Sequence, residues 1–299
     1  MALAAGLLVA ACSRPAAGPE PRRVLVLEGF DQPESVQYDP RQDVYFVSSM
    51  AGLGSARNGM GYIARARAER PEAWEVFVRS GVRGARLDAP KGLTLQGDTL
   101  WVADIDVLRG FHRRTGEPLA EIDLAPQGAV LLNALTVGPD GTLYATDSGI
   151  VMGAKGVEYV GGDKIFAIGS DGSVRIVAQG PELGHPNGIT WDPFGERLLV
   201  VSFHPFGSEL YALAPNGSKG EVLGRGTGRF DGVQVLPGGD VVVTAWSDSS
   251  LHRFSGGRSE RVLRDLWTAA DLGVDTRRHR VAIPLVLPGR VEVWEVPGR

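Results

Sequence analysis

The 299-residue sequence has a single cysteine, Cys12, which excludes an intramolecular disulfide framework as the basis of its stability. Its N-terminal apolar run, residues 1–12, is too short to cross a bilayer as a helix. A formal net charge of −4, with no block of Lys and Arg interleaved with aromatic residues, provides no basic surface for nucleic acid. The phosphate-loop spacing G-x-x-x-x-G-K-[ST] is absent too. With 43% hydrophobic and 22% charged residues, the composition is that of one globular domain that depends on its own core.

The segment before the cysteine, Val9-Ala10-Ala11-Cys12, resembles the lipobox at which bacterial lipoproteins are cleaved and lipidated. Ser13 follows it, which is compatible with sorting to the outer membrane of a Gram-negative cell. The Pro, Gly and Ala residues of the next segment are typical of a tether. We therefore expect a lipoprotein signal peptide over 1–12, lipidation of Cys12, a tether over 13–22 and a domain over 23–299. That domain would face the periplasm and contact the membrane only through its lipid.

A hairpin pattern recurs six times along the domain. In residues 186–203, a run of β-branched and aromatic residues, a turn on Asp192-Pro193-Phe194-Gly195 and a second apolar run follow one another. Similar segments begin at Pro33, Pro90, Leu132, Phe230 and Ala269. The first and last equivalent positions, Glu34 and Ala270, are 236 residues apart, so the mean of the five steps is about 47 residues. This period is typical of the blades of a β-propeller.

Each hairpin is followed by further strand-like runs, for example 163–168 and 173–178, and no segment has a helical period. Four short antiparallel strands per repeat predict an all-β fold, a six-bladed β-propeller in which radial repetition leaves few exposed edges. After the last hairpin, 269–286, only one strand remains, 291–296. We therefore expect the N-terminal strand, 23–27, to pair with the C-terminal blade and close the ring.

In such a fold the first strand of each blade lines the central channel, so the opening residues of the six strands face one another at one mouth. In chain order these ring residues are Glu34, Lys91, Asn133, Asn187, Asp231 and Ala270. Two carboxylates and two side-chain amides are hard oxygen ligands, the set that suits calcium. Zinc would require His and Cys, and the five histidines are dispersed. Taken singly, Asn and Asp before Gly are ordinary turn residues.

Two long connections and several polar residues are expected around the same mouth. The glycine-rich segments 48–61 and 148–163 both follow the second strand of a blade and suit a cover over a pocket, or are surface decoration. The ends of the second strands place further side chains near the ring, namely Asp104, Asp106, Asp147, His204 and Trp246. His204 and His185 are candidate proton shuttles, although a loop histidine is the simpler interpretation. Trp246 is expected to form a pocket wall.

The ordered set of motifs, from about Arg23 onward, resembles the senescence marker protein, gluconolactonase and regucalcin-like family of six-bladed propellers and the related diisopropyl fluorophosphatase and paraoxonase. The motifs are PESVQYD, NALTVGPDG, PNGITWD and FDGVQV. In that family a Glu opening the first blade, an Asn before a V-x-P-x-G turn, the Asn of P-N-G and the Asp of D-G bind a catalytic divalent metal, usually calcium. The resemblance implies that the metal ligands here are Glu34, Asn133, Asn187 and Asp231.

The activity implied by this resemblance is calcium-dependent hydrolysis of a lactone or related ester, a small-molecule substrate. Calcium, or another divalent cation, would polarise the carbonyl, stabilise the developing oxyanion and lower the pKa of a water molecule. Asp231 would be both ligand and catalytic residue, acting as general base or, as in the fluorophosphatase, as nucleophile. Asn133 would contact metal or substrate, and Lys91, Asp104, Asp106, His204 and Trp246 are the other candidate substrate contacts.

Two positions depart from the family pattern. Asn133 is followed by Ala134, where the family often has Asp. The second departure is Lys91, because an ammonium 5 Å from a calcium ion would be repelled by about 6–7 kcal/mol at an effective dielectric constant near 20. Lys91 therefore forms an ion pair with Asp104 or Asp106, binds an anionic group of the ligand, or replaces the metal between Glu34 and Asp231.

The last of these possibilities leads to a different class of function. The alternative to an enzyme is a non-catalytic periplasmic propeller whose mouth binds a small ligand or a partner protein. A purely structural calcium propeller is a third class. Because many functions share one fold, the fold does not decide among them.

Overall fold

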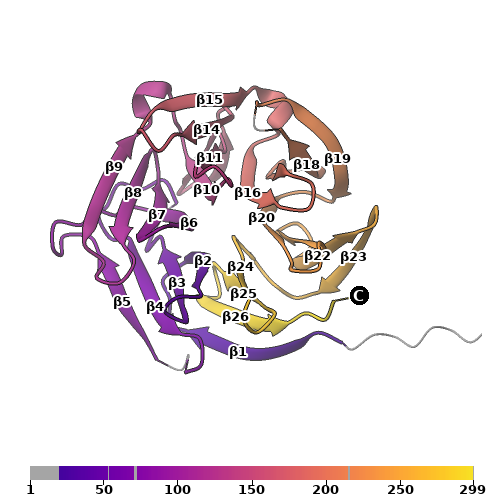
Figure 1. The fold of residues 1–299 in the computed structure, drawn as a ribbon, viewed down its shortest axis with the longest axis horizontal. Coiled ribbons are helices and arrows are strands. Elements are labelled where there is room, and N and C mark those ends of the chain that lie inside the picture. The colour runs from indigo at the N-terminus through magenta and orange to yellow at the C-terminus, as the bar shows by residue number, and fades with distance from the viewer. Residues whose placement is uncertain (1–19, 53, 71–72, 215, 299) are drawn as a thin grey trace, which may run out of the picture.

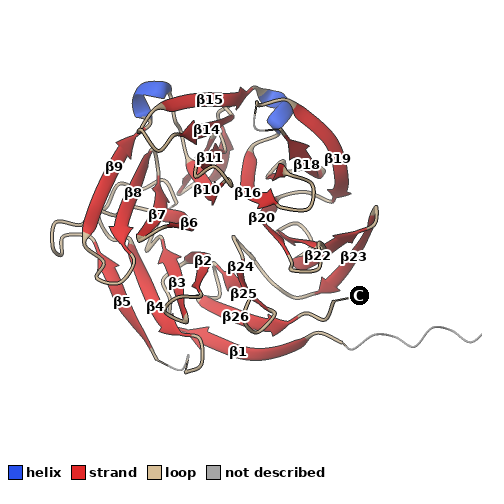
Figure 2. Cartoon of the chain, viewed as in Figure 1, coloured by secondary structure: helices blue, strands red, loops and turns tan. Residues whose placement is uncertain are grey.

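The computed structural model describes residues 20–298 except 53, 71–72 and 215. Six four-stranded antiparallel sheets surround a central channel, as Figure 1 shows, and Figure 2 shows how little helix there is. The six-bladed propeller predicted from the repeats is thereby confirmed. We call the end of the channel where the first strands begin the mouth face, and the opposite end the rear face.

The strands of each blade follow one another from the channel outward. Blade 1 consists of β2 (Pro33–Asp39), β3 (Val44–Ser49), β4 (Tyr62–Arg67) and β5 (Trp74–Arg79). Blade 2 consists of β6 (Pro90–Gln96), β7 (Thr99–Asp104), β8 (Val107–His112) and β9 (Pro118–Asp123). Blade 3 consists of β10 (Leu132–Val137), β11 (Leu143–Asp147), β14 (Lys164–Ile168) and β15 (Val174–Gln179). Blade 4 consists of β16 (Pro186–Asp192), β17 (Arg197–Ser202), β18 (Ser208–Leu213) and β19 (Lys219–Gly226). Blade 5 consists of β20 (Phe230–Val235), β21 (Val241–Ala245), β22 (Ser250–Ser255) and β23 (Arg258–Leu263). Blade 6 consists of β24 (Gly273–Asp275), β25 (Arg280–Leu285), β26 (Arg290–Glu295) and the N-terminal strand β1 (Arg22–Glu28). Two short 3-10 helices, η1 (Ala125–Gln127) and η2 (Pro181–Leu183), precede the first strands of blades 3 and 4.

The hydrophobic core is divided among the spaces between neighbouring blades. One cluster, for example, contains Phe46 of blade 1 together with Leu100 and Phe111 of blade 2. Comparable clusters occupy the other five spaces. Most second and third strands are buried along nearly their whole length, which explains why they are near-continuous apolar runs in the sequence.

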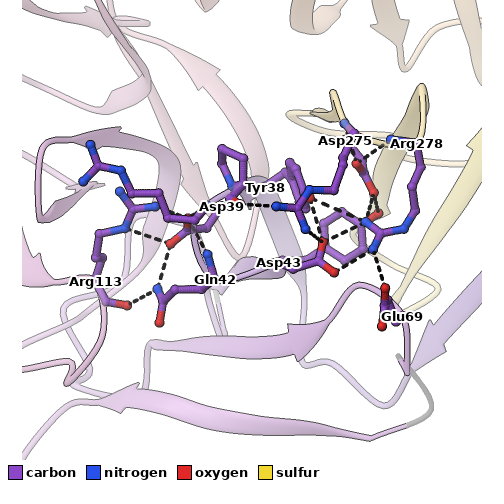
Figure 3. Close-up of polar contacts among 12 residues, drawn as sticks. Tyr38, Asp39, Gln42, Asp43, Glu69, Arg113, Asp275 and Arg278 are labelled. Carbon is purple, nitrogen blue, oxygen red and sulfur yellow. Dashed lines mark hydrogen bonds and ion pairs between the residues drawn. The ribbon is translucent and has the colours of Figure 1, made fainter.

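The ring closes as expected, because β1 pairs with β26 in the last sheet. On the rear face this closure is reinforced by hydrogen bonds between blades 1 and 6 (Figure 3). Arg278 binds both carboxylate oxygens of Asp43, at 2.8 and 2.6 Å, and also Asp275 at 2.9 Å. Tyr45 donates to Asp275 at 2.9 Å. The first and last blades are therefore joined by backbone pairing and by side chains.

A β-bulge lies at the ring residue in each of the first five blades. The pairing register between first and second strands shifts at the positions flanking Glu34, Lys91, Asn133, Asn187 and Asp231. Two of these bulges are each supported by a threonine of the second strand in the same blade. Thr146 Oγ1 accepts from the amide of Ala134 and donates to the carbonyl of Asn187, and Thr244 links Gly232 to Ala270 in the same way. Bulges commonly redirect a side chain, and here they set the positions of the ring residues.

The two long mouth-face connections, whose overhang was expected from their position, contact each other. The second of them contains a hairpin that the sequence reading missed, β12 (Ile150–Gly153) paired with β13 (Gly156–Tyr159). Ser55 of the first connection donates its amide to Met152 O at 3.1 Å, and the Met152 amide donates to Ser55 Oγ at 2.9 Å. The connections of blades 1 and 3 therefore form one roof on the mouth face.

The predicted signal peptide, Cys12 and most of the predicted tether lie outside the described residues. Within the part of the chain that is described, no helix has the length and apolar character needed to span a membrane.

Candidate metal and substrate site at the channel mouth

The four predicted ligand residues are all buried at the mouth end of the first strands, and each has an oxygen without a partner. Among the described residues, no hydrogen bond reaches Glu34 Oε2, Asn133 Oδ1, Asn187 Oδ1 or Asp231 Oδ1. A buried polar atom without a partner costs free energy, on the order of 1–3 kcal/mol, so such atoms are rare in folded proteins. Four of them in one register of the repeat indicate oxygens held for a group outside the protein chain.

The donor set fits a hard cation. Two carboxylates and two amide carbonyls are ligands that calcium accepts, with substrate or water completing six to eight positions. No group of three or more His, Cys, Asp or Glu side chains suited to a metal occurs in the described part of the chain. A cation at the ring would therefore depend on the amide oxygens of Asn133 and Asn187 as well as on carboxylates. Asn133 is also held in place, since its Nδ2 donates to Ser148 Oγ at 3.2 Å.

Lys91 lies within this site, and its side chain is 1% exposed. Its Nζ has one hydrogen-bond partner among the described residues, the weak acceptor Met50 Sδ at 2.9 Å. A Cβ added to Gly54 would lie 3.2 Å from Nζ, so the roof packs directly onto the ammonium. The ion pair with Asp104 or Asp106, one interpretation from the sequence, is absent from the described structure. Those two carboxylates pair with arginines instead.

A third carboxylate belongs to the site and was missed in the sequence. Ala270 takes the ring position of blade 6, as expected. Gly188 of blade 4 lies against the backbone of Asp231 and Val233 in blade 5, and Gly232 of blade 5 lies in the same way against Ala270 and Leu272 in blade 6. Ala270 is therefore the blade 6 equivalent of Asp231. The next residue, Asp271, is buried and accepts a hydrogen bond from Ser35 Oγ at 2.7 Å. Its backbone amide donates to Glu34 O at 2.9 Å. The aspartate in AADLGVD was the available signal, one residue beyond the aligned position.

The three carboxylates share one electrostatic environment. Burial raises the pKa of Glu34 to about 8; Lys91 lowers it and Asp271 raises it further. Burial also raises the pKa of Asp231 well above its ordinary value, with Glu34 and Asp271 adding to the shift. The pKa of Asp271 is raised to about 7 by burial, against the hydrogen bond from Ser35. Burial lowers the pKa of Lys91, which Glu34, Asp231 and Asp104 oppose. The site is thus short of positive charge when its carboxylates are ionised.

The aspartates predicted around the ring have partners on the mouth face. Asp104 accepts from the amides of Asp88 and Ala89 and binds Arg109 Nε at 2.8 Å. Asp147 accepts from the amides of Val130, Leu131 and Gly149. These two carboxylates hold their own loops. Asp106 binds Arg57 at 2.5 Å through one oxygen, whereas its buried Oδ1 has no partner among the described residues and is available to a ligand.

The two histidines lie side by side next to blade 4. Their ring centroids are 6.2 Å apart, and the planes of the two rings are nearly parallel. His185 has a left-handed φ of 60°, and its Nδ1 lies 3.1 Å from Asp163 Oδ1 and 3.0 Å from Ser148 O, so Nδ1 carries the proton. Hydrogen bonding to Asp163 raises the pKa of His185. His204 Nδ1 lies 2.9 Å from Phe206 O.

Surface cavities adjoin these histidines. Two of them, of about 310 and 660 Å³, are lined in part by His204. A larger cavity of about 930 Å³ lies away from the ring, on the outer side of blade 1. Its lining includes Arg65 and Glu75, which pair with each other at 2.5 Å. The histidine side of the mouth is therefore hollowed, whereas the largest of these three cavities is remote from the ring.

An apolar cluster lies at the mouth face, and together with the side chains packed against it includes residues of all six blades. Its buried members are Met50, Ala89, Ile105, Leu131, Ile150, Phe203, Ala270 and Val286. Met152 of the roof, Tyr159 and Trp246 pack against it. Trp246 contacts Phe203 edge to face, with ring centroids 5.5 Å apart. The indole N–H of Trp246 is close enough to Asp231 to lower the pKa of that carboxyl. Among the described residues, however, this N–H has no partner at full hydrogen-bond geometry. The ring is thus enclosed by apolar surface.

Solved structures with the same fold cover nearly the whole chain. A protein described as a candidate gluconolactonase shares 21% identity with a TM-score of 0.68, over 94% of this chain and 93% of that one. A gluconolactonase from Xanthomonas campestris shares 17% identity with a TM-score of 0.63, over 94% and 98% of the two chains. Virginiamycin B lyase from Staphylococcus aureus, solved in an inactive form with quinupristin, shares 13% identity with a TM-score of 0.61, over 93% and 99%.

No protein-family model matches the chain, and no curated protein matches it. The structural likeness supports the resemblance to gluconolactonase-like propellers at the level of the fold. Because hydrolases and a lyase both occur among the similar structures, the reaction has to be argued from the residues of the site.

Proposed function

We propose that this chain is a hydrolase of the lactonase type that binds calcium, or another divalent cation, at the mouth of its channel and opens a lactone or related ester. The observation that carries the proposal is the set of four buried oxygens without partners on Glu34, Asn133, Asn187 and Asp231. The fold shared with gluconolactonases supports the same reaction class. These residues would hold the cation between them.

The four proposed ligand residues have three roles in the proposed reaction. When bound, the cation polarises the ester carbonyl and stabilises the negative charge that develops on its oxygen. Glu34 and Asn187 act as ligands, and Asn133 contacts cation or substrate. Asp231 takes the proton of the attacking water, because a carboxylate within reach of that water can act as general base.

The surroundings of the ring suit this chemistry. The apolar cluster and the roof restrict water around the polar oxygens, which strengthens electrostatic interactions with a substrate carbonyl. Trp246 packs against this cluster and would form a pocket wall, with its indole N–H directed toward Asp231. The unpartnered Asp106 Oδ1 and the cavities beside His204 are further places for substrate contacts.

The test combines binding and turnover on the full chain. Calorimetric titration with calcium should show binding to the wild type, and a panel of lactones and esters should include a substrate whose hydrolysis stops with a chelator and resumes with calcium. Asp231→Asn should lose turnover by about a hundredfold or more, the usual effect of removing a general base. Asp140→Asn, in an exposed rear-face turn, is the matched control. Ligand binding that persists in chelator, without turnover of any ester, would favour the non-catalytic propeller instead.

The predicted lipid anchor also becomes a proposal here. β1 starts at Arg22 on the rear face, because Arg22 pairs with Glu295 and Glu28 pairs with Arg290. A lipid on Cys12 would thus be linked to the rear face, leaving the mouth directed away from the anchored end. Labelling of the wild type, but not of Cys12→Ser, with a fatty-acid analogue in Gram-negative cells would support the anchor; equal labelling of both would refute it.

A further inference from the structure

We propose that Asp271 compensates the charge of Lys91, so that the site can bind a divalent cation although it contains a buried lysine. This inference rests on the proposed cation site, and it concerns a residue that the repeat pattern does not assign. It accounts for Lys91 without an ion pair and without replacement of the metal.

The two residues lie on opposite sides of the ligand Glu34. Lys91 belongs to blade 2 and Asp271 to blade 6, while Glu34 opens blade 1 between them. Asp271 is fixed there by its backbone, which donates to Glu34 O at 2.9 Å and accepts from the Val36 amide at 3.2 Å. Its side chain is oriented by Ser35 Oγ at 2.7 Å. Asp271 is therefore a rigid part of the ring wall.

The fold does not require a carboxylate at this position. In the other five blades the equivalent residue, the one after the ring residue, is small: Ser35, Gly92, Ala134, Gly188 or Gly232. Ser35 Oγ also donates only one hydrogen bond to Asp271, which a neutral acceptor could receive equally well. A buried carboxylate that the backbone does not need and that costs desolvation energy indicates a role for its charge.

The charges of the site then balance with one divalent cation. Glu34, Asp231 and Asp271 provide three negative charges when ionised, and Lys91 provides one positive charge. The remaining excess of two negative charges equals the charge of one calcium ion. Without Asp271, the lysine would leave only one negative charge to hold that ion.

The influence of the two residues on the ligands is opposite in sign. Lys91 brings a positive charge and Asp271 a negative one, and the two residues belong to the blades on either side of Glu34. Lys91 therefore weakens the negative potential at the two carboxylate ligands, and Asp271 restores it. A divalent cation experiences the sum of these potentials at the site.

A set of four proteins tests the compensation: wild type, Asp271→Asn, Lys91→Met and the double variant, each titrated calorimetrically with calcium alone. We expect Asp271→Asn to weaken binding by about tenfold or more and Lys91→Met to strengthen it by a similar factor. The double variant should return to within about threefold of the wild type. Asp271→Asn retains an acceptor for Ser35, and Asp140→Asn serves as the exposed control.

Asp271→Gly, which copies three other blades, is a second variant that avoids any packing effect of the asparagine. Thermal melting in chelator shows whether the variants fold without metal, since loss of a buried carboxylate should leave the melting temperature unchanged or raised. The inference would be refuted if folded Asp271→Asn bound calcium as tightly as the wild type. It would also be refuted if the wild type bound no divalent cation, or if neither Asp271 variant folded. Calcium binding with the expected opposite shifts but no turnover would refute the proposed hydrolysis alone.

Discussion

The buried carboxylates of the first strands, which line the channel, are paired at the rear end but not at the mouth end. At the rear ends of the first strands the buried carboxylates are paired: Asp39 with Arg113 and Gln42, Asp192 with Arg197, and Asp275 with Arg278 and Tyr45 (Figure 3). On the mouth face Glu34 and Asp231 each have a buried oxygen without a partner in the described structure. Paired charges stabilise a fold, whereas unpaired ones cost stability unless a ligand completes them. The difference is consistent with a rear face that closes the propeller and with the ligand site that we propose at the mouth.

The exposed apolar side chains follow the same division. Six of the ten large exposed hydrophobic residues in the described structure lie on mouth-face connections: Met60, Val82, Val160, Phe206, Trp267 and Leu287. Phe194 is on a rear-face turn, and the other three are on outermost strands. These six residues come from separate connections, so they add apolar surface at several points around the mouth. The mouth face therefore offers apolar contact around a polar ring.

The strongest test of this contrast is Glu34→Gln, which removes the charge of a proposed ligand but keeps the shape of the side chain. We expect hydrolysis to fall by about a hundredfold or more, because the cation loses one of its two carboxylate ligands. In chelator the free energy of unfolding should stay equal or rise by about 1 kcal/mol, since an unpaired buried carboxylate is gone. Activity assays and urea unfolding measure the two effects, with Asp140→Asn as control. A variant that is both inactive and strongly destabilised in chelator would contradict the contrast.

The converse substitution on the rear face is Arg278→Met. It removes the partner of Asp43 and Asp275 and should lower the free energy of unfolding by roughly 2–4 kcal/mol, because a buried charge is left uncompensated. Calcium affinity should not change. Arg41→Met is the matched control: Arg41 pairs with Asp98 at 3.5 Å with both side chains exposed, so its loss should cost about 0.5 kcal/mol or less. Equal destabilisation by the two variants, measured by urea unfolding, would mean that the rear-face network does not close the ring.

The fold could be predicted from the sequence because the repeat is regular. The turn residues between apolar runs, and the free N-terminal strand, determined the number of blades and the way the ring closes. The hairpin β12–β13 was missed because it lies inside a glycine-rich connection, where alternation is weak. Its contacts with the first connection, through Ser55, depend on folding of residues about 97 positions apart.

The candidate site was predictable only in part, for a related reason. The residues at Glu34, Asn133, Asn187 and Asp231 occupy one register of the repeat, so the sequence could bring them together. Asp271 lies one residue beyond that register, and its burial against Ser35 follows from the packing of blade 6 on blade 1. The Lys91 environment was not predictable either, because Met50 and Gly54 come from a connection without a repeat equivalent.

The pH dependence of the metal-free protein should separate the two faces. The raised pKa values, about 8 for Glu34 and about 7 for Asp271, mean that the folded state retains protons that the unfolded chain releases above about pH 4–5. Stability should therefore fall as pH rises from about 5 to 8. Asp43, whose pKa is lowered to about 2 chiefly by its hydrogen bond from Arg278, contributes stability that is lost as pH falls from about 4 to 2.

Urea unfolding in chelator across pH 2–8 measures both limbs. Glu34→Gln should reduce the fall in stability between about pH 5 and 8, the upper limb of the curve, and leave the fall between about pH 4 and 2, the lower limb, unchanged. Asp43→Asn should reduce the lower limb and leave the upper limb unchanged. Calcium should raise stability most at the upper limb, because the cation favours the ionised carboxylates. An upper limb that is unaffected by Glu34→Gln and by calcium would show that these carboxylates do not control the stability of the mouth.

The smallest expected effect concerns the roof. Ser55→Ala removes the hydroxyl that accepts from the Met152 amide and leaves the reciprocal backbone bond intact. The free energy of unfolding should fall by about 1 kcal/mol or less. A looser roof over Lys91 should raise KM a few-fold with kcat nearly unchanged, since the roof contributes to binding and not to the ring. Ser173→Ala, in an exposed turn, is the control. A fall in kcat without a change in KM would instead assign the roof to the chemical step, and the division between a catalytic ring and a binding roof would have to be given up.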